Sequence, residues 1–249
     1  MMTNGQRILI TGANGGIGIA ICEDLLRNNS NLVLFYHKNR EEIDELIKKN
    51  PNWRELIESY QVDLLNENDM KNSLSIVLSK GTIDCFIHSV SIPLEMKSIT
   101  NLNWSHFQKN IEIQTKSFLR IVQSILPSMK AKKKGKIISI ISTAVIDKPP
   151  SNMSDYVVGK YSLLGLSKAL AVELDRFGIT VNCISPSMTN TKLIQNLPKN
   201  MIEISKNQVP SGRLTEPHDV SQVVNFLCSN DADRISGENI IISGGQTIN

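Results

Sequence analysis

Two side chains four residues apart, Tyr156 and Lys160, stand at the start of a strongly helical segment. This spacing places both on one face of a helix, one turn apart. A free tyrosine has a pKa of about 10 and donates protons poorly at neutral pH, but an adjacent ammonium stabilises the tyrosinate and lowers that pKa. The pair therefore suits proton transfer to a carbonyl oxygen, although the spacing taken alone is more typical of an ordinary surface pair.

A serine stands ahead of this pair, at the end of an apolar run. Residues 135–141 predict a buried strand, and Ser142 follows it, fourteen residues before Tyr156. A hydroxyl there can donate a hydrogen bond to a substrate carbonyl and to the charge that develops on its oxygen. Thr143 takes this role if the strand ends one residue later. A polar cap at the strand end is the structural alternative for Ser142.

A glycine-rich segment, residues 11–18, follows the first apolar run and opens the first helical pattern. Residues without a Cβ let the backbone approach a pyrophosphate, and a helix N-terminus offers that anion free N–H groups. The residues expected to contact a dinucleotide here are Gly12, Asn14, Gly15, Gly16, Ile17 and Gly18. An ordinary glycine turn is the alternative, but the position between a strand and a helix favours phosphate binding.

Alternating strands and helices must position these residues. Apolar runs predict strands at Arg7–Thr11, Leu32–Tyr36, Ile57–Val62, Ile83–Ser89, Lys136–Ser142, Ile179–Ile184 and Asn239–Ile242. Helical patterns lie near Gly16–Asn28, Arg40–Lys49, Asn68–Ser79, Phe107–Met129, Asp155–Arg176 and Pro217–Cys228. Continuously apolar strands suit a parallel sheet that is covered on both faces. We therefore predict a single-domain α/β fold, a doubly wound parallel sheet of about seven strands with helices on both faces.

The composition excludes several classes of protein. Apolar residues make up 41% of the 249 residues and charged residues 20%, which excludes wholesale disorder. The net charge of +3 is too small to indicate nucleic acid, and no apolar stretch approaches the ~18 residues of a membrane span. The short polar start leaves no room for a signal peptide, and four scattered cysteines indicate buried free thiols. We expect a cytoplasmic protein without metal, membrane or nucleic-acid partners.

The Thr-Gly-x-x-x-Gly-x-Gly spacing at residues 11–18, the chain length, and the order of Ser142, Tyr156 and Lys160 resemble the short-chain dehydrogenase/reductase family. The resemblance implies a Rossmann domain over residues 1–249, a nicotinamide cofactor, a catalytic Ser-Tyr-Lys set, and a substrate lid at about residues 187–210. Tyr156 and Lys160 would also contact the cofactor, Lys160 by holding the nicotinamide ribose. The other residues that the resemblance places against the cofactor are Asp63, Leu64, Ser89, Val90, Pro186, Ser187, Thr189 and Thr191. For Asp63, a helix N-cap is an alternative that is compatible with this role.

Three segments depart from the family pattern. His88–Ser91 stands where the family usually has Asn-Asn-Ala-Gly, and Pro186-Ser187 replaces a proline-glycine pair. The family often has an asparagine for proton relay at the position of Gln114, 28 residues before Ser142. Gln114 keeps an amide but reaches one methylene further, and Asn110, one turn earlier, is the rival for the relay.

The end of the second strand bears on the choice of cofactor. An acidic residue there would accept hydrogen bonds from the adenosine ribose and favour NAD, but His37, Lys38 and Arg40 stand there instead. Positive charge at this point suits the 2′-phosphate of NADP, and arginine can bind phosphate in a bidentate manner. NADP(H) is therefore favoured and NAD remains possible; a solvated basic turn is the structural alternative.

Within the family the chain is most similar to 3-oxoacyl carrier-protein reductases, which implies NADPH-dependent reduction of a ketone. Five lysines in the seven residues Lys130–Lys136 would attract an acidic acyl carrier protein, although a solvated helix end explains them equally well. A dehydrogenase of a small alcohol, sugar or steroid is the alternative within the enzyme class. A cofactor-binding scaffold without turnover is the alternative outside it.

Two predicted helices, Phe107–Met129 and Asp155–Arg176, are apolar almost all round, which is more than one buried face requires. A symmetric pairing of subunits would cover the surplus apolar surface. Family members commonly pair these two helices across a two-fold axis. We therefore expect a homotetramer, with a dimer as second choice.

Overall fold

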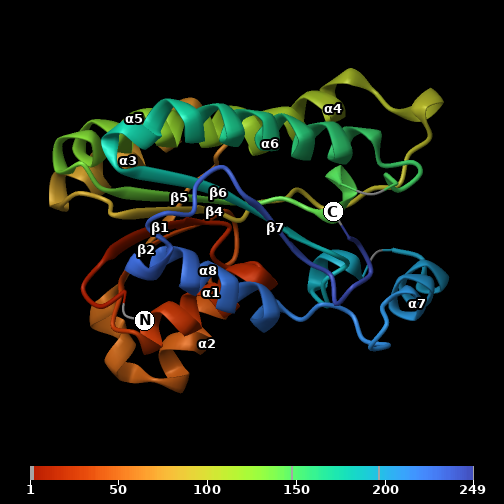
Figure 1. The fold of residues 1–249 in the computed structure, drawn as a ribbon, viewed down its shortest axis with the longest axis horizontal. Helices are drawn as coiled ribbons and strands as arrows, with labels where there is room; N and C mark the ends of the chain where they lie inside the picture. The colour runs from red at the N-terminus through yellow and green to blue at the C-terminus, as the bar shows by residue number, and fades with distance from the viewer. Residues whose placement is uncertain (1–2, 147, 196, 249) are drawn as a thin grey trace.

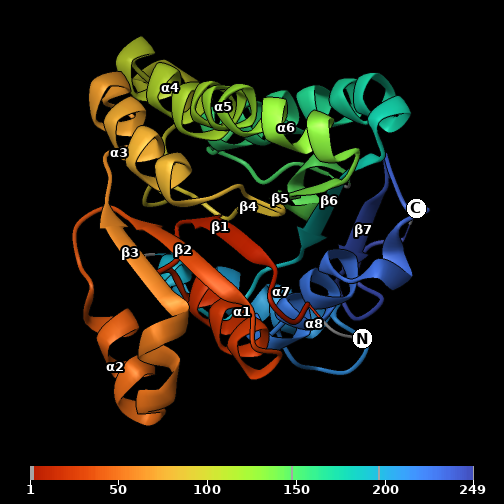
Figure 2. The ribbon, with the colours of Figure 1, turned by 90° about the vertical axis from the view of Figure 1, so that its left-hand side faces the viewer.

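A computed structural model describes residues 3–146, 148–195 and 197–248 of the chain. Its centre is a parallel sheet in the order β3-β2-β1-β4-β5-β6-β7 (Figure 2). The strands are β1 (Arg7–Thr11), β2 (Asn31–Tyr36), β3 (Ile57–Gln61), β4 (Cys85–His88), β5 (Gly135–Ile140), β6 (Ile179–Pro186) and β7 (Asn239–Ile242). The order reverses between β1 and β4, so their carboxyl ends diverge into a crevice where such sheets bind ligands. The predicted doubly wound α/β fold is confirmed.

Helices cover both faces of the sheet (Figure 1). One face carries α1 (Gly16–Arg27), α2 (Glu41–Lys49) and α8 (Pro217–Cys228), and the other carries α3 (Glu67–Lys80), α4 (Trp104–Ile111), α5 (Ser117–Lys132) and α6 (Ser154–Leu174). Because successive side chains of a strand point to opposite faces of the sheet, each strand contributes side chains to both hydrophobic cores. On β1, Leu9 packs into one core, while Ile8 and Ile10 pack into the other.

The helix predicted over Phe107–Met129 is not continuous. A π-helical turn, Glu112–Lys116, separates α4 from α5, and the amide of Ser117 donates to the carbonyl of Glu112. The carbonyl of Ile113 accepts instead from the Ser117 hydroxyl at 2.7 Å and contacts His88 Nε2 at 3.2 Å. Such single-turn bulges are frequent at functional sites. The apolar periodicity of the sequence continues through the turn, so it carried no sign of the interruption.

Other element boundaries also differ from the prediction. Strand β4 ends at His88 and β5 ends at Ile140, so Ser142 lies beyond its strand. The chain turns there because the Ser142 hydroxyl accepts from the amide of Ala144 at 3.2 Å and caps a short 3₁₀ turn. Within the segment predicted as a polar lid, residues 199–208 form a helix, α7 (Lys199–Gln208), beside the carboxyl end of the sheet (Figure 1).

The four cysteines are buried free thiols, as predicted. Cys85 on β4 and Cys228 at the end of α8 lie with their sulfur atoms 3.4 Å apart. Burial raises the pKa of Cys22 and Cys85 well above the ordinary value, which keeps these thiols protonated. No helix in the described part of the chain is both long and apolar enough to cross a lipid bilayer.

Candidate active site

The carboxyl ends of the strands open into a cleft of about 1100 Å³. Almost every residue that was predicted from the sequence to contact the cofactor or to take part in catalysis lines this cleft. Its walls include Gly12, Asn14, Gly15, Gly16, Ile17, Gly18, His37, Lys38, Asp63, Leu64, Ser89, Val90, Ser142, Tyr156, Lys160, Pro186, Ser187, Thr189 and Thr191. Arg40 and Gln114 do not line it.

The glycine loop is closely packed against the strand-end segments around it. Gly12 has φ +68, and a Cβ there would lie 2.2 Å from the carbonyl oxygen of Ser89. Only glycine fits such an approach in this conformation. At the N-terminus of α1, Gly15 supplies no side-chain cap, so the first N–H groups of the helix are not satisfied by a capping side chain. This cradle fits the pyrophosphate of a dinucleotide.

The basic residues after β2 separate into two groups. His37 and Lys38 line the cleft, whereas the Arg40 guanidinium pairs with Asp44, 3.1 Å away on the first turn of α2. The side chain of Asn14 donates to the carbonyl of Asn39 at 2.8 Å and ties the glycine loop to this turn. The expected contribution of Arg40 to the cleft is therefore not seen, because an i,i+4 ion pair holds its side chain on α2.

Asp63 also lines the cleft, after β3. Its Oδ1 accepts from the amide of Leu65 at 3.0 Å, which forms a local turn. The N-cap of α3 is Asn66, whose side chain accepts from the amides of Asn68 and Asp69. The alternative that Asp63 caps the helix is therefore wrong, since the cap lies three residues further along the chain.

Ser142 and Tyr156 both line the wall of the cleft. Desolvation by the surrounding protein raises the pKa of Tyr156, and the hydrogen bond with Ser142 opposes this effect. The Lys160 ammonium lies 5.9 Å from the centre of the Tyr156 ring. From the sequence, Lys160 is expected to lower the pKa of Tyr156; in this geometry burial dominates and the shift has the opposite sign.

Lys160 is buried and its ammonium contacts three oxygen atoms. It donates to Gln114 Oε1 at 3.0 Å, to the carbonyl of Ile140 at 2.9 Å and to the carbonyl of Val90 at 3.4 Å. Burial nevertheless lowers the pKa of Lys160 to about 7. A lysine with such a pKa can both hold and release a proton near neutral pH.

The π turn presents Gln114 to Lys160. Gln114 is fully buried and also donates from Nε2 to the carbonyl of Val90 at 3.0 Å. Asn110, the rival for this position, turns away and donates to Asp155 at 2.7 Å. Gln114 is therefore the amide in contact with Lys160, and its extra methylene gives direct contact with the ammonium.

His88, which replaces an asparagine of the family pattern, is a buried neutral side chain. Burial, together with the nearby charge of Lys160, lowers the pKa of His88 to about 3. Its Nε2 donates to the carbonyl of Ile113, so Nδ1 accepts from the Thr11 hydroxyl at 2.9 Å. His88 thus links β1 to the π turn beside the site.

A further set of apolar residues lines the cleft and was not predicted from the sequence. They come from the segment after β4, from the start of α6 and from the segment around α7: Ile92, Pro93, Leu94, Met153, Met188, Leu193, Ile194, Leu197, Met201 and Ile204. The feature of the sequence that could have identified these residues is the presence of apolar side chains within segments that are otherwise typical of polar loops. Among the described residues, no three potential metal ligands lie close enough to hold an ion.

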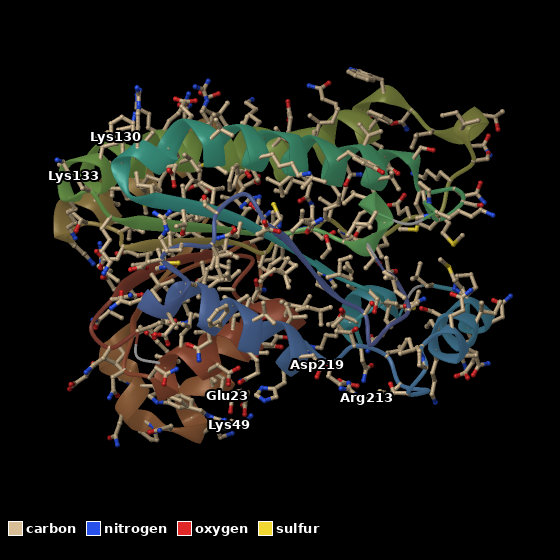
Figure 3. The ribbon with its side chains drawn as sticks, viewed as in Figure 1. Glu23, Lys49, Lys130, Lys133, Arg213 and Asp219 are labelled. Atoms are coloured by element: carbon tan, nitrogen blue, oxygen red, sulfur yellow. The ribbon has the colours of Figure 1, made fainter. Side chains whose placement is uncertain are left out.

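The cluster Lys130–Lys136 lies at the far end of the sheet from α7 (Figure 3). Several of its members have local partners. Lys132 pairs with Asp84 at 2.8 Å, Lys134 donates to Asn230 at 2.9 Å, and the buried Lys136 pairs with Asp233 at 2.7 Å. The cluster is therefore not a uniform basic patch, since these lysines stabilise strand and helix ends.

Residues 12–247 match the family model described as enoyl-(acyl carrier protein) reductase. The chain belongs to the short-chain dehydrogenase/reductase family. It is 28% identical to the 3-oxoacyl-(acyl-carrier-protein) reductase FabG of Buchnera aphidicola, with 98% of each chain covered. It is 26% identical to the FabG of Thermotoga maritima over the whole of both chains. Human dehydrogenase/reductase SDR family member 4 is 28% identical, with 95% of this chain and 86% of that relative covered.

Solved structures share the fold of this short-chain dehydrogenase/reductase. A 3-ketoacyl-(acyl-carrier-protein) reductase from Brucella melitensis, complexed with NADH, has a TM-score of 0.88 at 22% identity and covers 98% of this chain and 99% of its own. A short-chain type dehydrogenase/reductase from Mycobacterium ulcerans has a TM-score of 0.88 at 19% identity and covers 99% and 91%. As a family member, this chain is an NAD(P)-dependent oxidoreductase.

The buried Lys160 predicts a specific pH dependence of stability. Its pKa is about 7 in the folded chain and about 10.4 when unfolded, so between these values the unfolded state binds more protons. The free energy of unfolding of the wild type, minus that of Lys160→Met, should therefore rise from pH 7 to pH 10 and stay constant below pH 7. Urea unfolding at several pH values measures this difference, and parallel curves for the two proteins would contradict it.

Proposed function

We propose that this oxidoreductase uses NADPH to reduce the keto group of a 3-oxoacyl thioester, or of a related ketone, to a secondary alcohol. The observation that carries the proposal is that Ser142, Tyr156 and Lys160 line the same cleft as the glycine loop. A proton donor and a dinucleotide cradle in one cleft are the two parts that a carbonyl reductase requires. The bound nicotinamide would supply the hydride.

Each polar residue then has a defined task. Tyr156 donates the proton to the carbonyl oxygen, and Ser142 donates a hydrogen bond that stabilises the developing negative charge. Lys160 lies beside the Tyr156 ring, 5.9 Å from its centre, where it can hold and release a proton; as a family member it would also hold the nicotinamide ribose. Gln114 fixes the Lys160 ammonium from the π turn. Orientation by the cleft walls contributes much of the rate.

The cofactor side of the proposal concerns the 2′-phosphate of NADPH. His37 and Lys38 line the cleft after β2, where a ribose-binding carboxylate would favour NAD. The glycine loop and the uncapped start of α1 would hold the pyrophosphate, and the walls formed by Asp63 and Val90 would flank the adenosine part. NADH is the competing cofactor.

The substrate side concerns an acyl chain. Apolar residues after β4 and around α7 suit a flexible hydrocarbon better than a sugar. The FabG relatives are named as reductases of carrier-bound 3-oxoacyl groups, which supports an acyl carrier protein as partner.

Near the end of α5, Lys130 and Arg176 both contact the Phe177 ring, at 4.5 and 4.8 Å, and Lys133 is exposed nearby (Figure 3). This smaller basic surface is where we propose that an acidic carrier first meets the enzyme.

We further propose that the enzyme is a homotetramer. Most of the apolar residues of α6 pack against the core, but Val158, Tyr161 and Val172 remain exposed. Val172 is 85% exposed, which is unfavourable for a valine on a helix surface in water. A two-fold pairing of α6 with its copy would cover these side chains and give a dimer, and we propose that two such dimers pair to form the tetramer.

The proton donor is tested by replacing Tyr156 with phenylalanine. Tyr156→Phe should lower kcat with NADPH and a 3-oxoacyl thioester by roughly a thousandfold, because general acid catalysis is lost. The affinity for NADPH, measured by fluorescence titration, should stay within about twofold since the ring remains. Tyr161→Phe, an exposed tyrosine on the same helix, should behave like the wild type. Turnover of Tyr156→Phe within tenfold of the wild type would exclude Tyr156 as the proton donor.

The cofactor preference is tested at the end of β2. The wild type should prefer NADPH to NADH, and Lys38→Glu should reduce the ratio of the two kcat/KM values by about tenfold, or roughly 1.4 kcal/mol. Arg40→Glu should change this ratio much less, because Arg40 pairs with Asp44 and does not line the cleft. Equal kcat/KM values for the two cofactors in the wild type would contradict the NADPH assignment.

The assembly is tested by light scattering at micromolar concentration. The expected mass is about four times the 27.7 kDa of one chain. Val172→Glu should shift the mass downward, since a charge cannot be buried across a two-fold axis without a partner. A wild-type mass near 27.7 kDa would rule out both the tetramer and the dimer.

A further inference from the structure

A polar cluster lies behind the cleft, between α4 and the first turn of α6. Asp155, the residue immediately before Tyr156, is buried. Its Oδ2 accepts a hydrogen bond from Asn110 Nδ2 at 2.7 Å, and His106 Nε2 lies 3.0 Å from the same oxygen. None of His106, Asn110 and Asp155 lines the cleft, so the reaction described above does not use them directly.

The orientation of Asn110 shows how strongly this carboxylate is held. Asn110 commits its amide N–H to Asp155 and leaves its own Oδ1 buried without a hydrogen-bond partner among the described residues. An unsatisfied buried oxygen costs free energy, so the contact with Asp155 must offset that cost. A carboxylate in the first turn of a helix is also stabilised by the helix dipole.

The polar cluster between α4 and α6 is also connected to the wall of the cleft. The segment that leaves β4 lines the cleft at Leu94 and then runs to α4, which carries His106. On the way, the amide of Lys97 donates to the carbonyl of Asn152 at 2.8 Å, two residues before α6 begins. The start of α6 is therefore tied to this segment by a backbone hydrogen bond and by the contact of His106 with Asp155.

We propose that His106, acting through Asp155, is a positioning residue that fixes the first turn of α6 and so the phenol of Tyr156. This inference rests on the proposed function, because it concerns how the proton donor is oriented. A displacement of a catalytic group by a fraction of an ångström reduces the rate while cofactor binding elsewhere in the cleft persists. The loss of His106 therefore lowers kcat and leaves the KM for NADPH unchanged.

The chain supplies a matched control. His218 Nδ1 lies 3.4 Å from Asp24 Oδ2, between α8 and α1, and neither residue lines the cleft. This second pair also joins a histidine to a buried aspartate between two helices. It touches neither α4 nor α6, so its loss tests whether breaking any such pair is enough to affect catalysis.

The kinetic experiment compares three variants with the wild type on NADPH and a 3-oxoacyl thioester. His106→Leu should lower kcat by about tenfold while the KM for NADPH stays within about twofold. His106→Gln should recover most of the loss, because its amide can still donate to Asp155. His218→Leu should match the wild type. Equal kcat losses for His106→Leu and His106→Gln, or for His106→Leu and His218→Leu, would overturn the proposal, as would no loss in His106→Leu.

A second measurement is independent of turnover. Hydrogen–deuterium exchange of peptides covering residues 156–163 should be faster in His106→Leu than in the wild type and unchanged in His218→Leu. Unchanged exchange in His106→Leu would overturn the positioning role. If the wild type itself showed no turnover with any ketone, the proposed function would fail, while this exchange comparison would still decide whether His106 fixes the start of α6.

Discussion

The burial of one ammonium group organises this active site. Lys160 on α6 contacts oxygens from the π turn, from the segment after β4 and from the end of β5. A buried charge is stable only when such acceptors surround it, so these separate parts of the chain must converge on one point. Tyr156, one helical turn away, is placed by the same convergence. The order of the sheet makes it possible, because β4 and β5 are neighbours whose carboxyl ends meet beside α6.

Much of this arrangement was readable from the sequence. Apolar runs without alternation indicated a covered parallel sheet, and the spacing of the glycine loop, Ser142, Tyr156 and Lys160 indicated the parts of the cleft. These features are local, or they follow from a fixed distance along the chain. The identity of the amide beside Lys160 was left open between Gln114 and Asn110, because a helix of regular pitch would give both the same face.

The rest depended on interactions between distant residues. The π turn is invisible to periodicity, and the Ile113 carbonyl within it contacts His88 from a distant strand as well as the Ser117 hydroxyl. The pairing of Arg40 with Asp44 could not be read from the sequence, and the partners of Lys132 and Lys136 divided a cluster that looks continuous in the sequence. The sign of the pKa shift of Tyr156 followed from its enclosure, which no linear pattern records.

The π turn also restricts how the chain length can change. Its hydrogen bond spans one residue more than an α-helical one, since the amide of Ser117 donates to the carbonyl of Glu112. The wide turn absorbs this extra residue, so α4 and α5 keep the faces that they would present in an uninterrupted α-helix one residue shorter. Deleting one residue between Glu112 and Lys116 would therefore leave His106 and Asn110 facing α6, while removing the widened turn that presents Gln114 to Lys160. A change of length that leaves the rest of the helix in place would thus act first at the buried ammonium.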